Sequence, residues 1–293
     1  MSRSPASLTN LQAPAKLNLF LHVTGRRADG YHLLQSVFVP IDWCDTLHLH
    51  LRDDGQIHRH DLTTALPPDD LCLKAARLLQ QVSGTSLGAD IHIDKQVPWG
   101  AGLGGGSSDA ATVLKGLNTL WGLHWPAARL AELAVQLGAD VPFFIHGRPA
   151  WVEGIGEQIT PIELPDGVLN TPVAVLKPPV AIPTPAIFGS EKLRRDEKPA
   201  IVADFLAAPK QFGCNNLEEP AKAYSQEVIQ ALECMQARFG NSRMTGSGSA
   251  VFAWVDTRIH HLESFTPADV GVSPHTDQAP WAGRLCRLIQ QVR

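Results

Sequence analysis

Residues Val97–Leu114 read VPWGAGLGGGSSDAATVL, and five of the seven residues from Gly100 to Gly106 are glycine. Ordering a glycine where alanine would serve costs roughly 0.5–1 kcal/mol, so five glycines cost about 2.5–5 kcal/mol of a stability of about 5–15 kcal/mol. A flexible linker is one interpretation, but connections between an adjoining strand and helix usually have only about 4–6 residues. Bare backbone N–H groups at the positive end of a helix can instead approach an anion closely. We therefore predict that the run binds phosphate.

Two common nucleotide-binding signatures do not fit this run. Gly100, Gly102 and Gly105 satisfy GxGxxG, but a dinucleotide fold also needs an acidic residue about 20 residues later, and that window reads TLWGLHWP. A Walker loop needs Lys before Ser or Thr, and Gly106 stands at the lysine position. An oxidoreductase that binds a dinucleotide is thereby disfavoured.

The composition is that of a globular protein. The chain has 293 residues, of which 44% are hydrophobic and 18% charged, and a formal net charge of −4. This length favours two domains, and this charge gives no basic field to attract nucleic acid or an anionic membrane. Five scattered cysteines and the absence of a signal-peptide pattern favour a cytoplasmic protein with reduced thiols. We expect a monomer or a weak homodimer.

Strands and helices are expected to mix without regular alternation, which favours an α+β fold. Hydrophobic periodicity predicts strands at 15–23, 33–41, 45–54, 91–97, 173–177 and 249–255, with a hairpin turn after the first. It predicts helices at 70–82, capped by Asp69 or Asp70, from Ser107–Asp109 onward, from Pro126 to Gly138, and at 225–240. Residues 178–189 are expected to form a loop, and the weakly patterned segment at 162–170 a domain boundary.

Two charged residues invite a catalytic interpretation. Lys16 lies on a predicted apolar strand, where an inward lysine is costly unless it is paired, and Asp140 is the natural partner. A solvated, outward lysine is the alternative. Asp140, in LGADVP, reads on local sequence alone as a turn residue.

The glycine run has the form PxxxGLGxxSS, and with two further motifs it resembles the GHMP kinases. PAKLNLFL, residues 14–21, looks like the first motif of that family, and MTGSGSAVFAWV, residues 244–255, looks like its third. The blocks around Gly30, Tyr31 and His32, LGADVPFF, VEGIGE and IPTPAIF resemble those of members that phosphorylate the 2-hydroxyl of a CDP-linked methylerythritol in non-mevalonate isoprenoid synthesis.

This resemblance implies a two-lobed fold with the active site in the cleft between the lobes. It implies an ATP-binding domain at residues 1–165, a substrate-binding domain at 166–293, and ATP with Mg²⁺ as cofactors. Residues expected to bind ATP are Lys95, Gly100, Gly102, Leu103, Gly104, Gly105, Gly106, Ser107, Ser108 and Asp109, with Ser107 or Ser108 as the Mg²⁺ ligand.

The resemblance also implies the residues that handle the alcohol. Lys16 and Asp140 are the expected catalytic pair, with Asp140 accepting or orienting the alcohol proton. Residues expected to bind the CDP-linked substrate are Asn18, Tyr31, His32, Asp140, Phe188, Gly246 and Ser247. The sequence departs from the usual family text at Asp70 and Asn216, and adenine contacts near Asp70 are left open.

Two rival functions are compatible with the family motifs. One is a GHMP kinase for another small alcohol, such as mevalonate or homoserine, against which the Gly30–His32 block argues. The other is a catalytically silent nucleotide sensor, against which Lys16 and Asp140 argue.

Overall fold

In the computed structural model of this chain, residues 6–272 and 280–292 are described. The chain divides into two compact units, each described here by itself. The first takes the chain up to Ala15, Trp43–Val97 and Gly104–Gly147. The second takes Lys16–Asp42, Pro98–Leu103 and the chain from Arg148 onward. The second unit takes residues from both sides of residue 165. The division into an ATP-binding domain at 1–165 and a substrate-binding domain at 166–293 stays a prediction.

Two long strands, β1 (Ser7–Arg26) and β2 (His32–Arg52), pair with each other and have residues in both units. The turn between them closes with an N–H of Arg27 donating to the carbonyl of Tyr31 at 2.7 Å. This confirms the predicted hairpin. The separate strands expected at 33–41 and 45–54 are one continuous strand, because the intervening Asp-Trp-Cys contains neither Gly nor Pro to end it.

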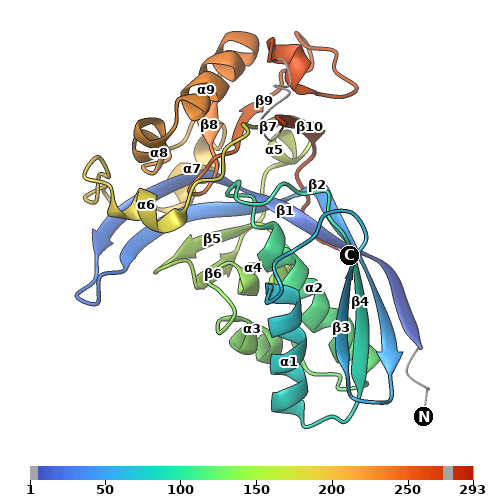
Figure 1. Cartoon of the computed structure of the whole chain (residues 1–293). Helices are drawn as coiled ribbons and strands as arrows, with labels where there is room; N and C mark the ends of the chain where they lie inside the picture. The colour runs from blue at the N-terminus through green and yellow to red at the C-terminus, as the bar shows by residue number, and fades with distance from the viewer. Residues whose placement is uncertain (1–5, 273–279, 293) are drawn as a thin grey trace. The chain divides into compact units, whose positions relative to one another are not determined.

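The first unit packs helices beside a strand layer. The C-terminal half of β2 pairs antiparallel with β4 (Gly88–Asp94), from Thr46↔Asp94 to Arg52↔Gly88, and β3 (Ile57–Asp61) pairs parallel with β4. Its helices are α1 (Leu71–Ser83), α2 (Gly105–Leu120), α3 (Ala127–Ala134) and α4 (Val141–His146). Helices α1 and α2 lie alongside each other (Figure 1).

Helix α1 has the N-terminal cap that its sequence predicts, and it ends at Ser83, one residue beyond the predicted end. Asp70 is the N-cap, and its Oδ1 accepts a hydrogen bond from the Leu73 N–H at 3.1 Å. Gly84 ends the helix in the left-handed conformation at φ 68°. The buried side chains of Cys72, Leu73 and Leu79 share one face, as an amphipathic helix requires.

Helix α2 begins at Gly105, earlier than the predicted Ser107–Asp109, so the last two glycines of the run are helical. Five apolar residues of this helix recur at helical spacing, and all are buried: Ala110, Val113, Leu114, Leu117 and Leu120. A Cβ atom on Gly116 would lie 2.4 Å from Leu49 Cδ1, so glycine lets this helix pack directly against β2. The end of the glycine run and the buried face thus belong to the same helix.

Helix α3 is shorter than its predicted span. It ends at Ala134 rather than Gly138, and Pro126 is its N-cap. The chain beyond it tightens, because Gln136 N–H donates to Leu133 and Leu137 N–H donates to Ala134. Such i to i+3 bonds end an α-helix in a turn.

The second unit contains two groups of strands. The N-terminal half of β2 pairs antiparallel with β5 (Ala150–Glu153), which pairs with β6 (Gln158–Pro161). A four-stranded sheet has the order β10-β7-β9-β8 and consists of β7 (Val173–Lys177), β8 (Arg243–Met244), β9 (Val251–Trp254) and β10 (Ala282–Cys286). Its neighbours are all antiparallel.

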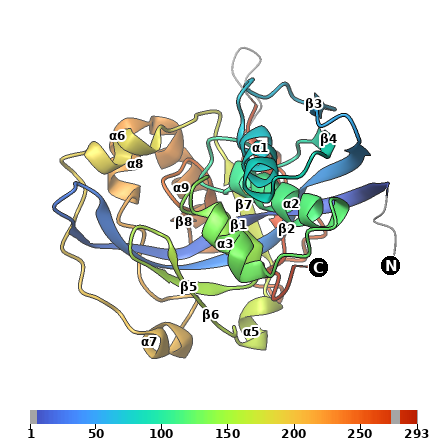
Figure 2. The same cartoon turned by 90° about the horizontal axis from the view of Figure 1, so that it is seen from below.

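Helices cover the four-stranded sheet. Helix α9 (Gln226–Phe239) packs on β7 and β9, and α8 (Glu218–Tyr224) contacts both α9 and α6 (Thr184–Gly189). Figure 2 shows α6, α8 and α9 grouped together. The remaining helical segments are α5 (Asp166–Leu169), α7 (Val202–Ala207) and the 3₁₀ turn η1 (Pro267–Val270). Gly240 caps α9 as its sequence predicts.

Helix α6 corrects the loop predicted for 178–189. Proline is compatible with the first turn of a helix, where its missing N–H has no intrahelical role, and Pro185 is the second residue of α6. The mixed, mainly antiparallel strands and interspersed helices confirm the α+β class. Within residues 6–272 and 280–292, none of the helices has both the length and the apolar character for a membrane span.

Candidate active site

Three sequence motifs meet in the second unit. The Lys16 N–H of β1 donates to the carbonyl of Leu103 at 2.8 Å, which ties the first motif to the glycine run. The Ala250 N–H donates to the carbonyl of Ala101 at 3.0 Å, which ties the third motif to the same run. The Asn18 N–H donates to Thr245 Oγ1 at 2.8 Å and closes the set. Backbone hydrogen bonds therefore fix the start of the glycine run between the other two motifs.

Two glycines allow this close approach. Gly102 has φ 73°, and a Cβ atom there would lie 2.4 Å from the Thr245 carbonyl oxygen. Gly246 has φ 56°, and a Cβ atom there would lie 2.9 Å from the Gly102 carbonyl oxygen. Side chains rarely adopt such φ values, and neither position has room for one. These two glycines thus serve loop packing, a structural role that the phosphate interpretation alone does not require.

Lys16 is buried, with 3% of its surface exposed, so the solvated alternative for this lysine is wrong. Its ammonium donates to Asn18 Oδ1 at 2.5 Å and lies 4.7 Å from the ring centroid of Phe38. Asn18 in turn donates from Nδ2 to Ser36 Oγ at 2.9 Å. The hydrogen bonds from Lys16 to Asn18 and from Asn18 to Ser36 thereby orient the ammonium group of Lys16. Its pairing with Asp140 stays a prediction.

The rest of the glycine run lies in the first unit, at the entrance of α2. Gly104 is the N-cap in the left-handed conformation at φ 71°, and the Ser108 N–H makes a helical bond to its carbonyl at 2.9 Å. The N–H groups of Gly105, Gly106 and Ser107 precede that bond and have no partner within the helix. They face the N-terminal end of the helix, where the dipole favours an anion.

The two candidate Mg²⁺ ligands differ in access. Ser107 is partly exposed, whereas Ser108 is fully buried. Ser108 Oγ has no hydrogen-bond partner among the described residues. A hydroxyl left without a partner in the interior is unusual, so this oxygen has spare capacity for a contact.

Lys95 and Asp109, both predicted to contact ATP, bind each other. Lys95 Nζ donates to Asp109 Oδ2 at 2.7 Å and also to Asp45 Oδ2, and all three groups are nearly inaccessible to solvent. Asp45 Oδ1 accepts from the N–H groups of Gln96 at 2.6 Å and Val97 at 2.8 Å. This triad holds the chain before the glycine run to the start of α2.

The charges of the triad follow from burial and from its two acids. Burial raises the pKa of Asp109 to about 8, and Asp45 acts in the same direction against the opposing attraction of Lys95. Burial opposes the charge of Lys95, but Asp109 and Asp45 outweigh it and raise its pKa. Burial thus favours the protonated form of Asp109, which weakens its repulsion of an anion at the entrance of α2.

Sequence reasoning missed Asp45, although a signal was present. Asp45 alternates in step with Leu47 and Leu49, which are both buried, so period-two patterning places its side chain on the inward face. An acid on an inward face needs a cationic or N–H partner. That need points to Lys95 and the backbone beside it.

Asp140 precedes α4 in the first unit and is partly exposed. The residues that follow it, from Val141 to Ile145, are buried. Pro142 in the first turn fixes where the helix begins. Asp140 is therefore anchored by a buried helix, although it also fits the turn position that its local sequence suggests.

Two of the predicted base-binding rings come together in the second unit. The rings of His32, at the start of β2, and Phe188, in α6, stack with centroids 5.1 Å apart and planes at 27°. Tyr31, next to His32, is 60% exposed. Thr184, which is in α6 with Phe188, has its Oγ1 2.9 Å from Ser247 Oγ, and this contact links α6 to the third motif.

The two departures from the usual family text have structural roles here. Asp70 caps α1 and forms an ion pair with Arg59 at 2.8 Å. Asn216 Oδ1 accepts from the Val23 N–H at 2.8 Å, and its Nδ2 donates to Glu197. Both side chains are therefore engaged with the protein.

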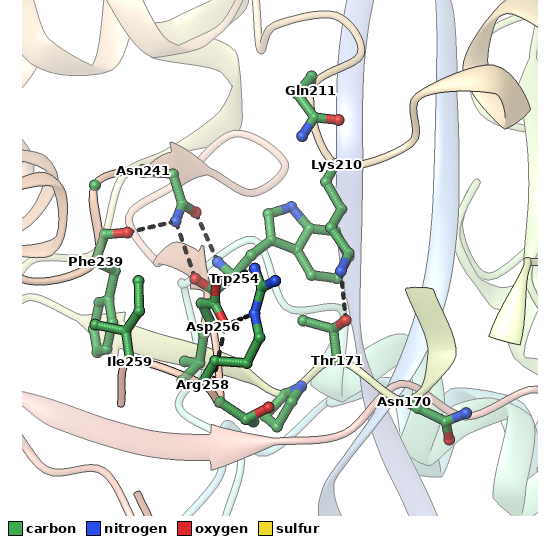
Figure 3. Close-up of a pocket in the computed structure, with 14 residues that line it drawn as sticks. Asn170, Thr171, Lys210, Gln211, Phe239, Asn241, Trp254, Asp256, Arg258 and Ile259 are labelled. Carbon is green, nitrogen blue, oxygen red and sulfur yellow. Dashed lines mark hydrogen bonds and ion pairs between the residues drawn. The ribbon is translucent and has the colours of Figure 1, made fainter. Parts of the chain in front are cut away.

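A hollow of about 690 Å³ in the second unit is lined in part by Trp254 and Val255, at the end of the third motif, but by none of the residues predicted to bind ATP or substrate (Figure 3). Its polar groups bind one another: Lys210 to Thr171, Arg258 to Asp256 at 2.6 Å, and Asn241 to the backbone of Trp254. Lys210 also lies 5.7 Å from the Trp254 ring. Because these groups already satisfy each other, the hollow is not the candidate site.

Comparison with known proteins decides the family. The model of the GHMP kinases N terminal domain matches residues 70–148, and that of the GHMP kinases C terminal matches 199–261. A 4-diphosphocytidyl-2-C-methyl-D-erythritol kinase of Methylibium petroleiphilum is 60% identical over 281 residues, which cover 96% of this chain and 94% of that protein. This chain belongs to the GHMP kinase family.

Other GHMP kinases extend the comparison. A protein of the same description from Polaromonas naphthalenivorans is 48% identical over 300 residues, covering 99% of this chain and 95% of that protein. A crystal structure of 4-(cytidine 5'-diphospho)-2C-methyl-D-erythritol kinase matches with a TM-score of 0.74 and 32% identity, over 94% of this chain and 98% of that chain. A mevalonate kinase structure matches with a TM-score of 0.70 at 13% identity, covering 97% of this chain and 100% of that chain, which shows the shared fold alone.

Proposed function

We propose that this protein is an ATP-dependent kinase that phosphorylates the 2-hydroxyl of 4-diphosphocytidyl-2-C-methyl-D-erythritol, in the non-mevalonate synthesis of isoprenoid precursors. The observation that carries the proposal is the meeting of the three family motifs through the backbone bonds of Lys16, Ala101, Leu103 and Ala250. Two relatives that are 60% and 54% identical to this chain bear the name of that kinase.

The entrance of α2 fits a triphosphate. The N–H groups of Gly105, Gly106 and Ser107 are free of helical bonds, and only an ordinary contact with Leu71 Cδ1 at 3.8 Å limits space at Gly106. Gly106 is exposed, so its missing Cβ leaves room for an oxygen at the backbone. We assign phosphate binding to this entrance, next to the buried Asp109, whose pKa burial raises.

Mg²⁺ fits the same place through a serine hydroxyl. The ion prefers oxygen ligands, keeps several waters and takes other ligands from phosphates, so one protein hydroxyl suffices. Ser107 is the accessible candidate, and Ser108 Oγ is the buried oxygen without a partner. When bound, the ion supplies positive charge that offsets charge developing on the transferred phosphoryl group.

Lys16 and Asp140 are the groups that we assign to the alcohol. Asp140 orients the hydroxyl and takes up its proton as the bond between the alcohol oxygen and the γ-phosphorus forms, while the bond from that phosphorus to the β–γ bridging oxygen of ATP breaks and ADP leaves. The buried Lys16 ammonium, oriented by Asn18, lowers the proton affinity of that hydroxyl and compensates negative charge. Burial strengthens such an interaction, because little water screens it.

The aromatic pair supports a nucleobase on the substrate. His32 and Phe188 already stack on each other, and the exposed Tyr31 ring is adjacent in sequence. Stacking of a base on an aromatic ring contributes about 1–3 kcal/mol. Mevalonate and homoserine have no such ring, so these residues favour a cytidine-bearing alcohol over either rival substrate.

The test is a substrate panel with the purified chain, ATP and Mg²⁺. We expect phosphate transfer to the CDP-linked alcohol and at most trace transfer to mevalonate or homoserine. Transfer to either of these alone would overturn the substrate assignment. Binding of ATP without transfer to any alcohol would favour the silent sensor.

A further inference from the structure

Arg195 joins the two rings of the proposed base site. Its Nε donates to Nε2 of His32 at 3.0 Å. Its other nitrogens donate to three carbonyl groups at and after the end of α6: Leu193 at 3.0 Å, Phe188 at 3.1 Å and Ser190 at 2.9 Å. One side chain thereby holds the segment that carries Phe188 against the ring of His32.

This contact determines which nitrogen of His32 carries its proton. A guanidinium has only donors and stays protonated, so the imidazole nitrogen that faces it must accept. Nε2 of His32 therefore has no hydrogen, and the proton of the neutral ring resides on Nδ1. Burial lowers the pKa of His32, and Arg195 and Arg26 lower it further, in keeping with a neutral ring.

Nδ1–H is the free polar edge of this ring. None of the described residues forms a hydrogen bond with it, while Nε2 is committed to Arg195. The ring face is covered by Phe188. His32 thus offers a ligand one directed donor, and Arg195 prevents the ring from offering an acceptor instead.

We propose that Arg195 is a positioning residue that sets a preference for cytosine over uracil, by holding His32 in the tautomer with its proton on Nδ1. This inference rests on the proposed function, because it identifies the base that the same site recognises. In cytosine, ring nitrogen N3 is an acceptor and matches the Nδ1–H donor. In uracil, N3 carries a hydrogen, so two donors would face each other and one would lose its partner.

The tautomer can be measured without substrate. Nitrogen NMR of protein labelled with ¹⁵N-histidine distinguishes a protonated from an unprotonated ring nitrogen, and a His32→Gln sample assigns the signal. We expect the Nδ1–H form for wild type and for Arg195→Lys, since lysine also has only donors. We expect a mixture or the Nε2–H form in Arg195→Met. An Nε2–H ring in wild type would overturn the inference.

Base preference is measured as the ratio of the dissociation constants for UDP and CDP, by calorimetry on the same proteins. Losing one hydrogen bond to a buried polar group corresponds to about a tenfold change. We expect the preference for CDP to fall at least about tenfold in Arg195→Met, with recovery of most of it in Arg195→Lys. The value of kcat for the CDP-linked alcohol should change less than its KM, because Arg195 acts through His32.

Arg194→Met is the matched control, because Arg194 is a solvent-facing neighbour that pairs with Asp196 at 3.2 Å. It should leave the preference unchanged. The inference would be overturned if folded Arg195→Met kept the wild-type ratio of dissociation constants for UDP and CDP. It would also be overturned if Arg195→Lys lost the preference for CDP as fully as Arg195→Met. If wild type binds neither nucleotide, the proposed function falls with it. If wild type prefers CDP but phosphorylates no alcohol, only the proposed function falls.

Discussion

A Cβ atom on Gly102 would lie 2.4 Å from the carbonyl oxygen of Thr245, a distance that real Cβ atoms do not reach. The contact joins the glycine run to the third family motif by direct packing of two backbones. The Gly102 carbonyl oxygen in turn lies 2.9 Å from the place that a Cβ atom on Gly246 would occupy. The start of the glycine run is therefore held by the protein itself, before any ligand binds.

Gly102→Ala should destabilise the protein by about 1–3 kcal/mol, because alanine is strained at φ 73° and meets a backbone oxygen that cannot move cheaply. Urea unfolding measures the change. Gly106→Ala is the matched control for stability, since it lies in α2 with its nearest contact at 3.8 Å, and alanine should stabilise a helix by about 0.5–1 kcal/mol. Equal effects of the two changes would contradict this account of the loop.

The pKa of Asp109 predicts how stability depends on pH. Its folded value of about 8 lies above the ordinary 3.8, so the folded state binds more protons than the unfolded state between these limits. Stability should therefore fall as pH rises from about 4 to about 8, by about 1.4 kcal/mol for each unit of difference in pKa. Asp109→Asn mimics the protonated form and should remove most of this slope, as unfolding at pH 5, 7 and 9 would show.

Asp45→Asn provides the contrast for that experiment. Asp45 accepts bonds from Lys95 and from two backbone N–H groups, so an amide there weakens several contacts and removes the charge opposite Lys95. We expect it to destabilise the protein clearly at pH 7, where Asp109→Asn does not. The reverse order would show that Asp109, rather than Asp45, carries the negative charge of the triad.

Asp140→Asn should lower kcat by about 100- to 10,000-fold, the usual range for loss of a general base, while ATP still binds. Single-turnover kinetics and calorimetry with ATP measure the two effects separately. Asp166→Asn, in the short helix α5, serves as a surface control and should keep the wild-type rate. A wild-type rate in the Asp140 variant would remove this residue from the mechanism.

Phe188→Ala should raise KM for the CDP-linked alcohol by about 5- to 150-fold, since stacking on a base contributes about 1–3 kcal/mol. KM for ATP should stay within about threefold. Phe188→Tyr retains a ring and should restore most of the affinity. If the alanine variant weakened ATP instead, the ring would belong to the other nucleotide.

Much of this organisation could be predicted from the sequence, because local rules decide it. The cap at Asp70, the hairpin turn at Gly30 and the helix end at Gly240 each depend on the conformation of one or two residues. The end of α3 was misplaced, because the i to i+3 bonds at Ala134 depend on how the chain packs beyond it.

In the site, too, the sequence predicts individual residues but not the contacts between distant ones. Motif spacing identified Lys16, the glycine run and Phe188, but the partners of these residues lie far away in sequence. Asp45 bonds Lys95 across 50 residues and Arg195 bonds His32 across 163, and no periodicity connects such pairs. The sequence singled out Lys16 but left open whether its side chain is solvated or buried. The structure decides this, because Lys16 is buried.

The most direct measurement is a ³¹P NMR assay of the purified chain with ATP, Mg²⁺ and 4-diphosphocytidyl-2-C-methyl-D-erythritol. A new phosphate monoester signal that couples to the position-2 carbon of the alcohol, and appears as ADP forms, is the expected result. ATP that remains intact, or a phosphate that appears only when mevalonate or homoserine replaces this alcohol, would contradict the proposed function.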